Sequence, residues 1–223
     1  MQHMERRLMR NILTTSMSLV VVFMTSCQKR GIPPGADLRF QSALKAAERG
    51  NADSMFYVGY WLANGNHVDQ DLSAAWEWFH KAAEKNNADA MNCIGVQYRD
   101  GIYVEQDYQK AREWLLRGHE ANRWNHVVLA NLALTLAQGF QDYDKAHEFA
   151  DMAISLAPNN TFVLGVKGRI YLMQDNPEDA YAYLKKCKEI TPHYLRTNAP
   201  FAKALRAWAD SARAAREKAS DRN

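Results

Sequence analysis

Two consecutive stretches of 36 residues in this chain align with each other without a gap. The first is NADSMFYVGYWLANGNHVDQDLSAAWEWFHKAAEKN (51–86), the second is NADAMNCIGVQYRDGIYVEQDYQKAREWLLRGHEAN (87–122), and 14 positions are identical. A repeated unit of this length cannot bury its apolar face alone, so neighbouring units must stack to form a continuous core. The repeat therefore predicts a fold that is built by stacking along one axis.

Each unit has the pattern of two helices joined by a loop. Met55, Gly59 and Leu62 follow helical spacing, and the small Gly59 allows a second helix to approach closely. Gly65 is placed to end the first helix in a left-handed conformation, and Asp71 is placed to cap the second. The residues that we expect to face inward on the second helix are Ala75, Trp78 and Ala82. The same residue types recur in the second unit at Gly95, Gly101, Asp107, Ala111 and Trp114.

The loop segment HVDQD, residues 67–71, contains one imidazole and two carboxylates and so has the composition of a metal or acid–base site. The equivalent segment of the second unit is YVEQD, in which Tyr103 replaces His67. A metal site would depend on its imidazole ligand. The replacement therefore favours a structural role for the segment, at the start of a helix.

A second period, of 34 residues, covers 127–160 and 161–194. Pro158 and Pro192 occupy equivalent positions in the two units. Asn-Pro at 176–177 combines an N-cap residue with a proline at the first helical position, which is typical of a helix start. This part of the chain is also expected to form helix pairs.

The two regions resemble two related repeat families. Residues 51–122 carry the A…G…G-x-x-V-x-x-D…A-x-x-W pattern of Sel-one-like repeats. The spacing of a tetratricopeptide repeat is kept by Gly168, Tyr171, Ala180 and Pro192. The resemblance implies an all-α fold, a right-handed α-solenoid of about four helix-turn-helix repeats with a capping helix at each end. The expected order is a capping helix at 38–50, two Sel-one-like repeats at 51–122, two tetratricopeptide-like repeats at 123–194, and a C-terminal capping helix and tail at 195–223.

The N-terminus has the pattern of an export signal over residues 1–26, with basic residues followed by an apolar run of about 15 residues. Met24-Thr25-Ser26-Cys27 resembles the lipobox of bacterial lipoproteins, which implies cleavage before Cys27 and lipidation of its sulfur. Gln28 rather than aspartate follows the cysteine, which in that family favours the outer over the inner membrane. The expected location is the periplasm-facing side of the outer membrane; the alternatives are the inner membrane and the cell surface. An uncleaved anchor helix is the alternative to cleavage. Residues 27–37, with two prolines between two glycines, are expected to form a tether.

Charge is unevenly distributed along the chain. Residues 1–26 carry +2, residues 27–195 carry −3 and residues 196–223 carry +4, which together give the net +3. The body lacks the clustered Lys and Arg that bind phosphate, so no nucleic-acid partner is expected. The C-terminal segment combines an apolar stripe with a basic face, so it either caps the last repeat or binds an anionic membrane or an acidic partner.

No sequence motif indicates a catalytic residue, a metal site or a cofactor. The chain contains no paired-cysteine zinc pattern, HExxH, Walker loop or GxSxG. Cys93 and Cys187 fall on helical positions about two and a half repeats apart, too far for a disulfide, so we expect two buried free thiols. The histidines are scattered without ligand spacing.

The repeat families bind partners in a concave groove that is lined by the first helix of each repeat. Carried onto this chain, the groove positions are Phe56, Tyr60, Asn92, Arg99, Asn131, Gln138, Phe162 and Arg169. Within a repeat these positions share one helix face. The alternative for any one of them is a plain solvated surface.

The function that these features favour is a non-enzymatic adaptor or scaffold. It would be held by lipid in a bacterial envelope and would bind, in its groove, a peptide or helix of an envelope assembly or secretion protein. One alternative is a surface-displayed protein that binds host molecules. A second is an enzyme acting on envelope polymers, for which the sequence offers no acid–base pair. The oligomeric state is left open.

Overall fold

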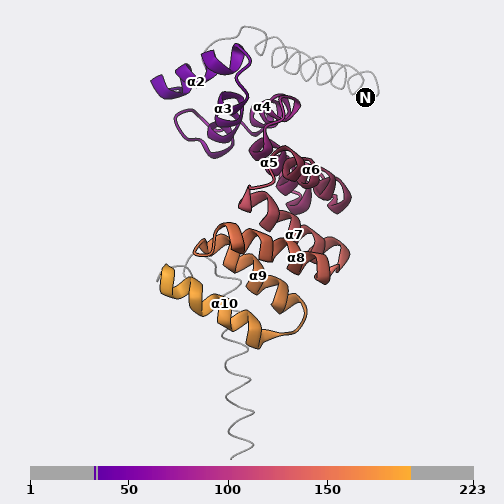
Figure 1. Ribbon diagram of the computed structural model, residues 1–223. Helices are drawn as coiled ribbons and strands as arrows, with labels where there is room; N and C mark the ends of the chain where they lie inside the picture. Colours follow the sequence, from indigo (N-terminus) through magenta and orange to yellow (C-terminus); the bar gives the residue numbers. More distant parts are fainter. Residues whose placement is uncertain (1–32, 34, 192–223) are drawn as a thin grey trace, which may run out of the picture.

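The computed structural model describes residue 33 and residues 35–191. Within this part the chain forms nine α-helices and no strand (Figure 1). The helices are α2 (Leu38–Glu48), α3 (Ala52–Asn64), α4 (Leu72–Glu84), α5 (Ala88–Asp100), α6 (Tyr108–Ala121), α7 (His126–Phe140), α8 (Tyr143–Leu156), α9 (Thr161–Met173) and α10 (Pro177–Ile190). The signal peptide expected at 1–26, the lipidated Cys27 and the C-terminal cap expected at 195–223 lie outside the described residues.

The helices form consecutive pairs that stack along one axis. In each of the four repeats a first helix (α3, α5, α7 or α9) packs against a second (α4, α6, α8 or α10), and α2 packs on α3. The stack places α2 and α10 at opposite ends of the molecule (Figure 1). This arrangement confirms the all-α solenoid that the repeat periods predict.

Close packing within the first two pairs depends on one glycine in each. A Cβ at Gly59 would lie 2.9 Å from the Phe79 ring, and a Cβ at Gly95 would lie 2.7 Å from Leu115 Cγ. Phe79 and Leu115 are fully buried. Each pair is therefore held by a bulky side chain of the second helix that occupies the space left by glycine on the first.

The expectation that the recurring tryptophans face inward was wrong in part. Trp78 and Trp114 are only half-buried, at the edge of the core. Each lies beneath a basic side chain, with Lys81 Nζ 4.5 Å from the Trp78 ring and the Arg117 guanidinium 4.2 Å from the Trp114 ring. The residue that does fill the core is Phe79 in the first repeat and Leu115 in the second. Because the residue type differs, this position is not among the identities of the aligned repeats.

The helix ends follow the local signals in the sequence. Asp71 and Asp107 accept hydrogen bonds from the backbone N–H groups of Ala74 and Lys110, at 2.9 Å in both cases. Gly65 adopts a left-handed conformation, with φ of 68°, at the end of α3, as does its counterpart in α5. The predicted caps are confirmed, because each one satisfies backbone groups within its own repeat.

A ladder of asparagines joins successive repeats. The Asn87 side chain caps α5 through its oxygen and donates from Nδ2 to Asp53 Oδ1 of the preceding repeat, at 2.9 Å. Asn125 donates in the same way to Asp89 Oδ1, at 2.8 Å. The Asn-Ala-Asp triplet at 87–89 thus links its repeat to both neighbours. Asn87 donates a hydrogen bond to the preceding repeat, and Asp89 accepts one from the following repeat.

His67 connects the first loop to the N-terminal helix. It has a left-handed backbone, with φ of 64°, and its Nδ1 lies 2.7 Å from Asp37 Oδ2. Asp37 caps α2 and also donates its backbone N–H to the carbonyl of His67, at 2.8 Å. The HVDQD segment therefore fastens α2 to the first repeat.

Two buried clusters make up the core. One spans α2 to α5 and includes Phe40, Val58 and Phe79. The other spans α6 to α9 and includes Leu115 and Leu129. Among the described helices, none is long and apolar enough to cross a membrane.

Candidate functional site

Three of the eight predicted groove residues form a polar ladder across the first helices of two repeats. Asn131 on α7 donates from Nδ2 to Asn92 Oδ1 on α5, at 2.8 Å. Arg99, also on α5, donates from Nη1 to Asn131 Oδ1, at 2.8 Å. These two hydrogen bonds join residues 32 and 39 positions apart in the sequence, so the three side chains lie next to one another. We call these three residues the polar ladder.

Burial limits what the polar ladder can do. Arg99 is 7% exposed and Asn131 is 4% exposed. The Arg99 guanidinium also donates from Nε and Nη2 to the two carboxylate oxygens of Asp100, at 2.7 and 2.9 Å. A bidentate pair of this kind fixes the side chain in one orientation. The polar ladder therefore holds α5 and α7 in register, and its outermost member, the half-buried Asn92, is the one most open to a partner.

Aromatic side chains cover the exposed side of α3. Phe56 lies with its ring 5.3 Å from Tyr57 and 6.0 Å from Tyr60, and Tyr57 lies 5.9 Å from Trp61. Tyr57 is 50% exposed and Tyr60 is 43% exposed. We call these four residues the aromatic strip.

The aromatic strip is specific to the first repeat. The equivalent positions of α5 hold Asn92, Cys93, Val96 and Gln97. The two repeats have the same fold, so an aromatic side chain at these positions is not needed to form the helix pair. Phe56 and Trp61 do gain packing, against Phe79 and Phe40 respectively, whereas the exposed rings of Tyr57 and Tyr60 remain available.

The other three predicted groove residues lie further along the stack. Phe162 is 40% exposed at the start of α9, and Arg169 is half-buried two turns later. Gln138 is half-buried, and its Oε1 is an enclosed oxygen without a hydrogen-bond partner among the described residues. No hydrogen bond links Gln138 or Phe162 to the polar ladder within the described part of the chain.

An ion pair between a buried lysine and a largely exposed aspartate joins α8 and α9, and it was not predicted from the sequence. Lys167 is 2% exposed, and its Nζ lies 2.7 Å from Asp151 Oδ1 and donates to the carbonyl of His147, at 3.4 Å. Burial raises the pKa of the adjacent Tyr171, helped by the carboxylates of Asp179 and Asp151. The one available signal was a lysine among apolar residues on a helix. The pair joins neighbouring repeats, because Asp151 and His147 lie on α8 and Lys167 lies on α9.

The two thiols in the described part of the chain are free, as predicted. Cys187 is buried, as expected, whereas Cys93 is only half-buried. Burial raises the pKa of Cys93 to about 12, with a further contribution from Asp89, and burial raises the pKa of Cys187 to about 11. Only the thiolate is reactive. Among the described residues, no group of three His, Cys, Asp or Glu side chains is placed to hold a metal ion.

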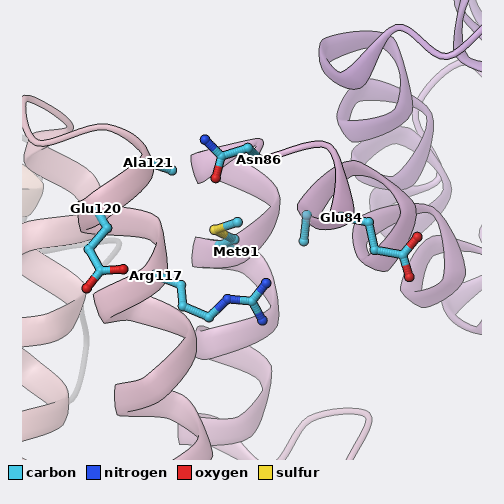
Figure 2. A pocket seen from close by; sticks show the side chains of 7 residues that line it. Glu84, Asn86, Met91, Arg117, Glu120 and Ala121 are labelled. Atoms are coloured by element: carbon cyan, nitrogen blue, oxygen red, sulfur yellow. The ribbon is translucent and has the colours of Figure 1, made fainter.

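A hollow of about 250 Å³ lies between α4, α5 and α6. Arg117 extends along it below Met91, while Glu84 and Glu120 direct their carboxylates to opposite sides (Figure 2). Arg117 is held over the Trp114 ring. A small-molecule site is usually an enclosed apolar pocket with convergent polar groups. This hollow has divergent charges, so we do not identify it as a ligand site.

Comparison with known proteins supports the repeat architecture. The Sel1 repeat family matches residues 52–87, 88–121 and 128–157. The third match falls within the first 34-residue unit, so Sel1-type features extend beyond the two 36-residue units. No match to a curated protein was found.

Solved structures share the fold. A Sel1 repeat protein from Oxalobacter formigenes is 24% identical with a TM-score of 0.58, covering 74% of this chain and 65% of its own. A protective antigen of uropathogenic Escherichia coli with an SLR fold is 23% identical with a TM-score of 0.56, and the match covers 78% of this chain and 41% of the antigen. A thermophilic TPR protein from Thermus thermophilus is 18% identical with a TM-score of 0.59, covering 74% and 87%.

This chain thus spans less than two thirds of the first two of these structures. At these identities the likeness concerns the fold alone. The fold is an all-α solenoid of Sel1- and TPR-like repeats, and the three matched segments are similar to Sel1 repeats.

Proposed function

We propose that this protein is a non-enzymatic adaptor, anchored by lipid at Cys27 in a bacterial envelope, that binds a peptide or helix of an envelope assembly or secretion protein. Sel1 and TPR repeat proteins are generally protein–protein interaction scaffolds, and this chain contains Sel1 repeats. The binding surface would be the face formed by the first helices of the repeats.

The observation that carries this proposal is the aromatic strip on α3. Tyrosine and tryptophan are enriched at the centre of protein interfaces, because they bury a large area at little cost in conformational entropy. Tyr57 and Tyr60 are half-exposed, and repeat packing does not require an aromatic residue at either position. The polar ladder supports this surface from the adjacent repeats, because it keeps α5 and α7 in a fixed register.

Photo-crosslinking in cells tests the binding surface. A photoreactive amino acid would replace Tyr60 or Phe162, which are exposed at separate points of the predicted groove. Glu77, exposed on α4, is the control position. We expect one dominant envelope protein to be captured from Tyr60 and Phe162 and not from Glu77. Capture from Glu77 alone, or from none of the three in exported and folded protein, would contradict the groove as the binding surface.

The anchor is tested separately by the intact mass of protein extracted from membranes. Cleavage and acylation predict a chain that starts at Cys27 with added acyl mass. A mass that still contains Met1 would support the uncleaved anchor helix instead.

Two other functions would give different results. A surface-displayed protein that binds host molecules would be degraded when intact cells are treated with protease, whereas a periplasm-facing adaptor would be protected. An enzyme acting on envelope polymers would show a pH-dependent activity that depends on an acid–base pair.

A further inference from the structure

The outer face of α2 is a basic stripe with an apolar tip. Leu38, Ser42, Lys45 and Arg49 lie at i, i+4, i+7 and i+11, so they share one side of the helix. All four are exposed, and Leu38 is 82% exposed. The exposed Glu48 lies beside the stripe, at i+3 from Lys45, but none of the ion pairs in the described part of the chain involves Lys45 or Arg49. We call these four residues the α2 stripe.

The chain enters α2 from a fixed point. The backbone N–H of Ala36 donates to the carbonyl of Pro33, at 3.2 Å, and Asp37 is held twice by His67. Gly35 packs against Asp69, where a Cβ would come within 2.5 Å of its carboxylate. The loop of the first repeat therefore grips the chain just before α2.

Little chain separates this grip from the proposed anchor. Residues 28–32 lie between Cys27 and Pro33. A chain of this length spans at most about 20 Å when fully extended. If Cys27 carries lipid, Pro33 must remain within about that distance of the membrane surface. The start of α2 follows five residues later, while α10 is at the far end of the stack (Figure 1).

We propose that the α2 stripe lies on the anionic headgroups of the membrane that holds the lipid anchor. This inference rests on the proposed lipidation of Cys27. Basic side chains near a membrane are attracted to anionic lipid, and an exposed leucine enters the boundary between headgroups and acyl chains. The first repeat is then held against the bilayer, and the rest of the stack extends away from it.

Fluorescence quenching by lipid tests this contact. Protein extracted from membranes would carry Ser42→Cys, labelled with a thiol-reactive fluorophore, and would be reconstituted in phosphatidylglycerol vesicles that contain a headgroup quencher. Cys93 and Cys187 have raised thiol pKa values and should stay unlabelled. We expect strong quenching at residue 42 and little at the control Glu178→Cys, which is exposed on α10. The quenching should weaken at high salt and in phosphatidylcholine vesicles.

A matched pair of charge variants distinguishes binding by the α2 stripe from quenching that arises only because the anchor holds α2 near the membrane. Lys45→Gln with Arg49→Gln should lower the equilibrium constant for contact roughly 30-fold, because each basic residue contributes about one factor of five. Lys185→Gln with Lys188→Gln removes the same charge from the far end and should change nothing. Equal quenching in both variants, or none at residue 42 in anchored protein, would overturn the proposal and leave α2 as a face for an acidic protein.

Absence of acylation at Cys27 would not by itself show whether the α2 stripe binds a membrane. If the mass shows no acyl chain on Cys27, Ser42→Cys is combined with Cys27→Ser, labelled in the same way and mixed with added phosphatidylglycerol vesicles. Quenching at residue 42 that requires Lys45 and Arg49 would then support the stripe by itself. Its absence would overturn the stripe together with the anchor.

Discussion

At the scale of single residues, Gly95 shows how little space separates the two helices of a repeat. A Cβ there would lie 2.7 Å from Leu115 Cγ and 3.2 Å from the carbonyl oxygen of Ala111. We expect Gly95→Ala to lower the free energy of unfolding by about 1–3 kcal/mol through overpacking, as measured by chemical denaturation.

Gly118 offers the matched control for that substitution. Its added Cβ would meet its nearest neighbours at 3.4 Å, which is ordinary contact. Gly118→Ala should therefore be neutral or stabilise α6 by up to about 1 kcal/mol, because alanine has the higher helix propensity. Equal destabilisation by both substitutions would mean that loss of glycine, rather than the contact with Leu115, is responsible.

The two described cysteines give a second prediction at this scale. Burial raises the pKa of Cys93 to about 12 and that of Cys187 to about 11, so almost no thiolate exists at pH 8. Reaction of both with a disulfide reagent should be slow in the folded protein and fast in denaturant. Rapid labelling of either one under native conditions would show that its helix opens locally.

At the scale of helices and turns, the asparagine ladder explains why the Asn-Ala-Asp triplet recurs. Asn87→Asp keeps the oxygen that caps α5 but places a carboxylate against Asp53, where an amide now donates at 2.9 Å. We expect a loss of about 1–2 kcal/mol, measured by thermal or chemical unfolding. Asn51→Asp is the control, because Asn51 caps α3 in an exposed position and donates to no upstream repeat among the described residues. A similar loss in both variants would show that the hydrogen bond from Asn87 to Asp53 does not stabilise the stack.

His80 links α4 to α6 and makes this junction sensitive to pH. Its ring lies 4.5 Å from Trp76 and 5.3 Å from Trp114. Burial lowers the pKa of His80 below its ordinary value of 6.5; Glu84 raises it and Arg117 lowers it further. Because the unfolded chain binds the proton more readily, the stability from His80 is complete above about pH 6.5 and declines as the pH falls below it.

Titration of His80 by NMR would check this directly. Glu84→Gln should lower the pKa of His80 further, and Arg117→Gln should raise it, since these are the charges that act on it. A pKa that ignores both substitutions, or lies above 6.5, would show that the imidazole is solvated and that α4 and α6 are not packed around it.

At the scale of the whole molecule, the polar ladder lies where the two core clusters meet. Arg99 and Asn131 join α5 of the first cluster to α7 of the second. Stability in a solenoid is a sum of repeat and interface terms, so a weak interface lets the two parts unfold separately. Arg99→Met should cost about 2–3 kcal/mol, because it leaves buried polar groups unpaired.

Hydrogen exchange would locate the effect of that substitution. Protection of backbone amides against exchange should fall first in the helices on one side of the junction between α5 and α7, instead of falling equally in all helices. Arg123→Met, at an exposed position in the turn before α7, is the control and should change little. Uniform loss of protection in Arg99→Met would show that the solenoid unfolds as a single unit.

Part of the fold and part of the candidate site were predictable from the sequence. The repeat periods, the capping aspartates and the left-handed glycines depend on signals within one unit, and a single unit contains all the atoms that they need. Comparing the two copies also predicted a structural role for the His67 segment, and in the structure His67 contacts Asp37. Asn92, Arg99 and Asn131 were predicted as groove positions, and the structure places their side chains in one hydrogen-bonded group; that they line a binding groove stays a prediction.

Only the tertiary structure decided how those faces meet. The sequence did not show that Arg99 and Asn131 are buried partners, that Phe79 rather than Trp78 fills the core, or that Lys167 pairs with Asp151. Each of these depends on the rotation between neighbouring helices, which side-chain packing sets and which the length of a repeat does not specify. The period of the sequence thus determines a stack of helix pairs, while the packing between pairs determines which residues are left exposed to bind.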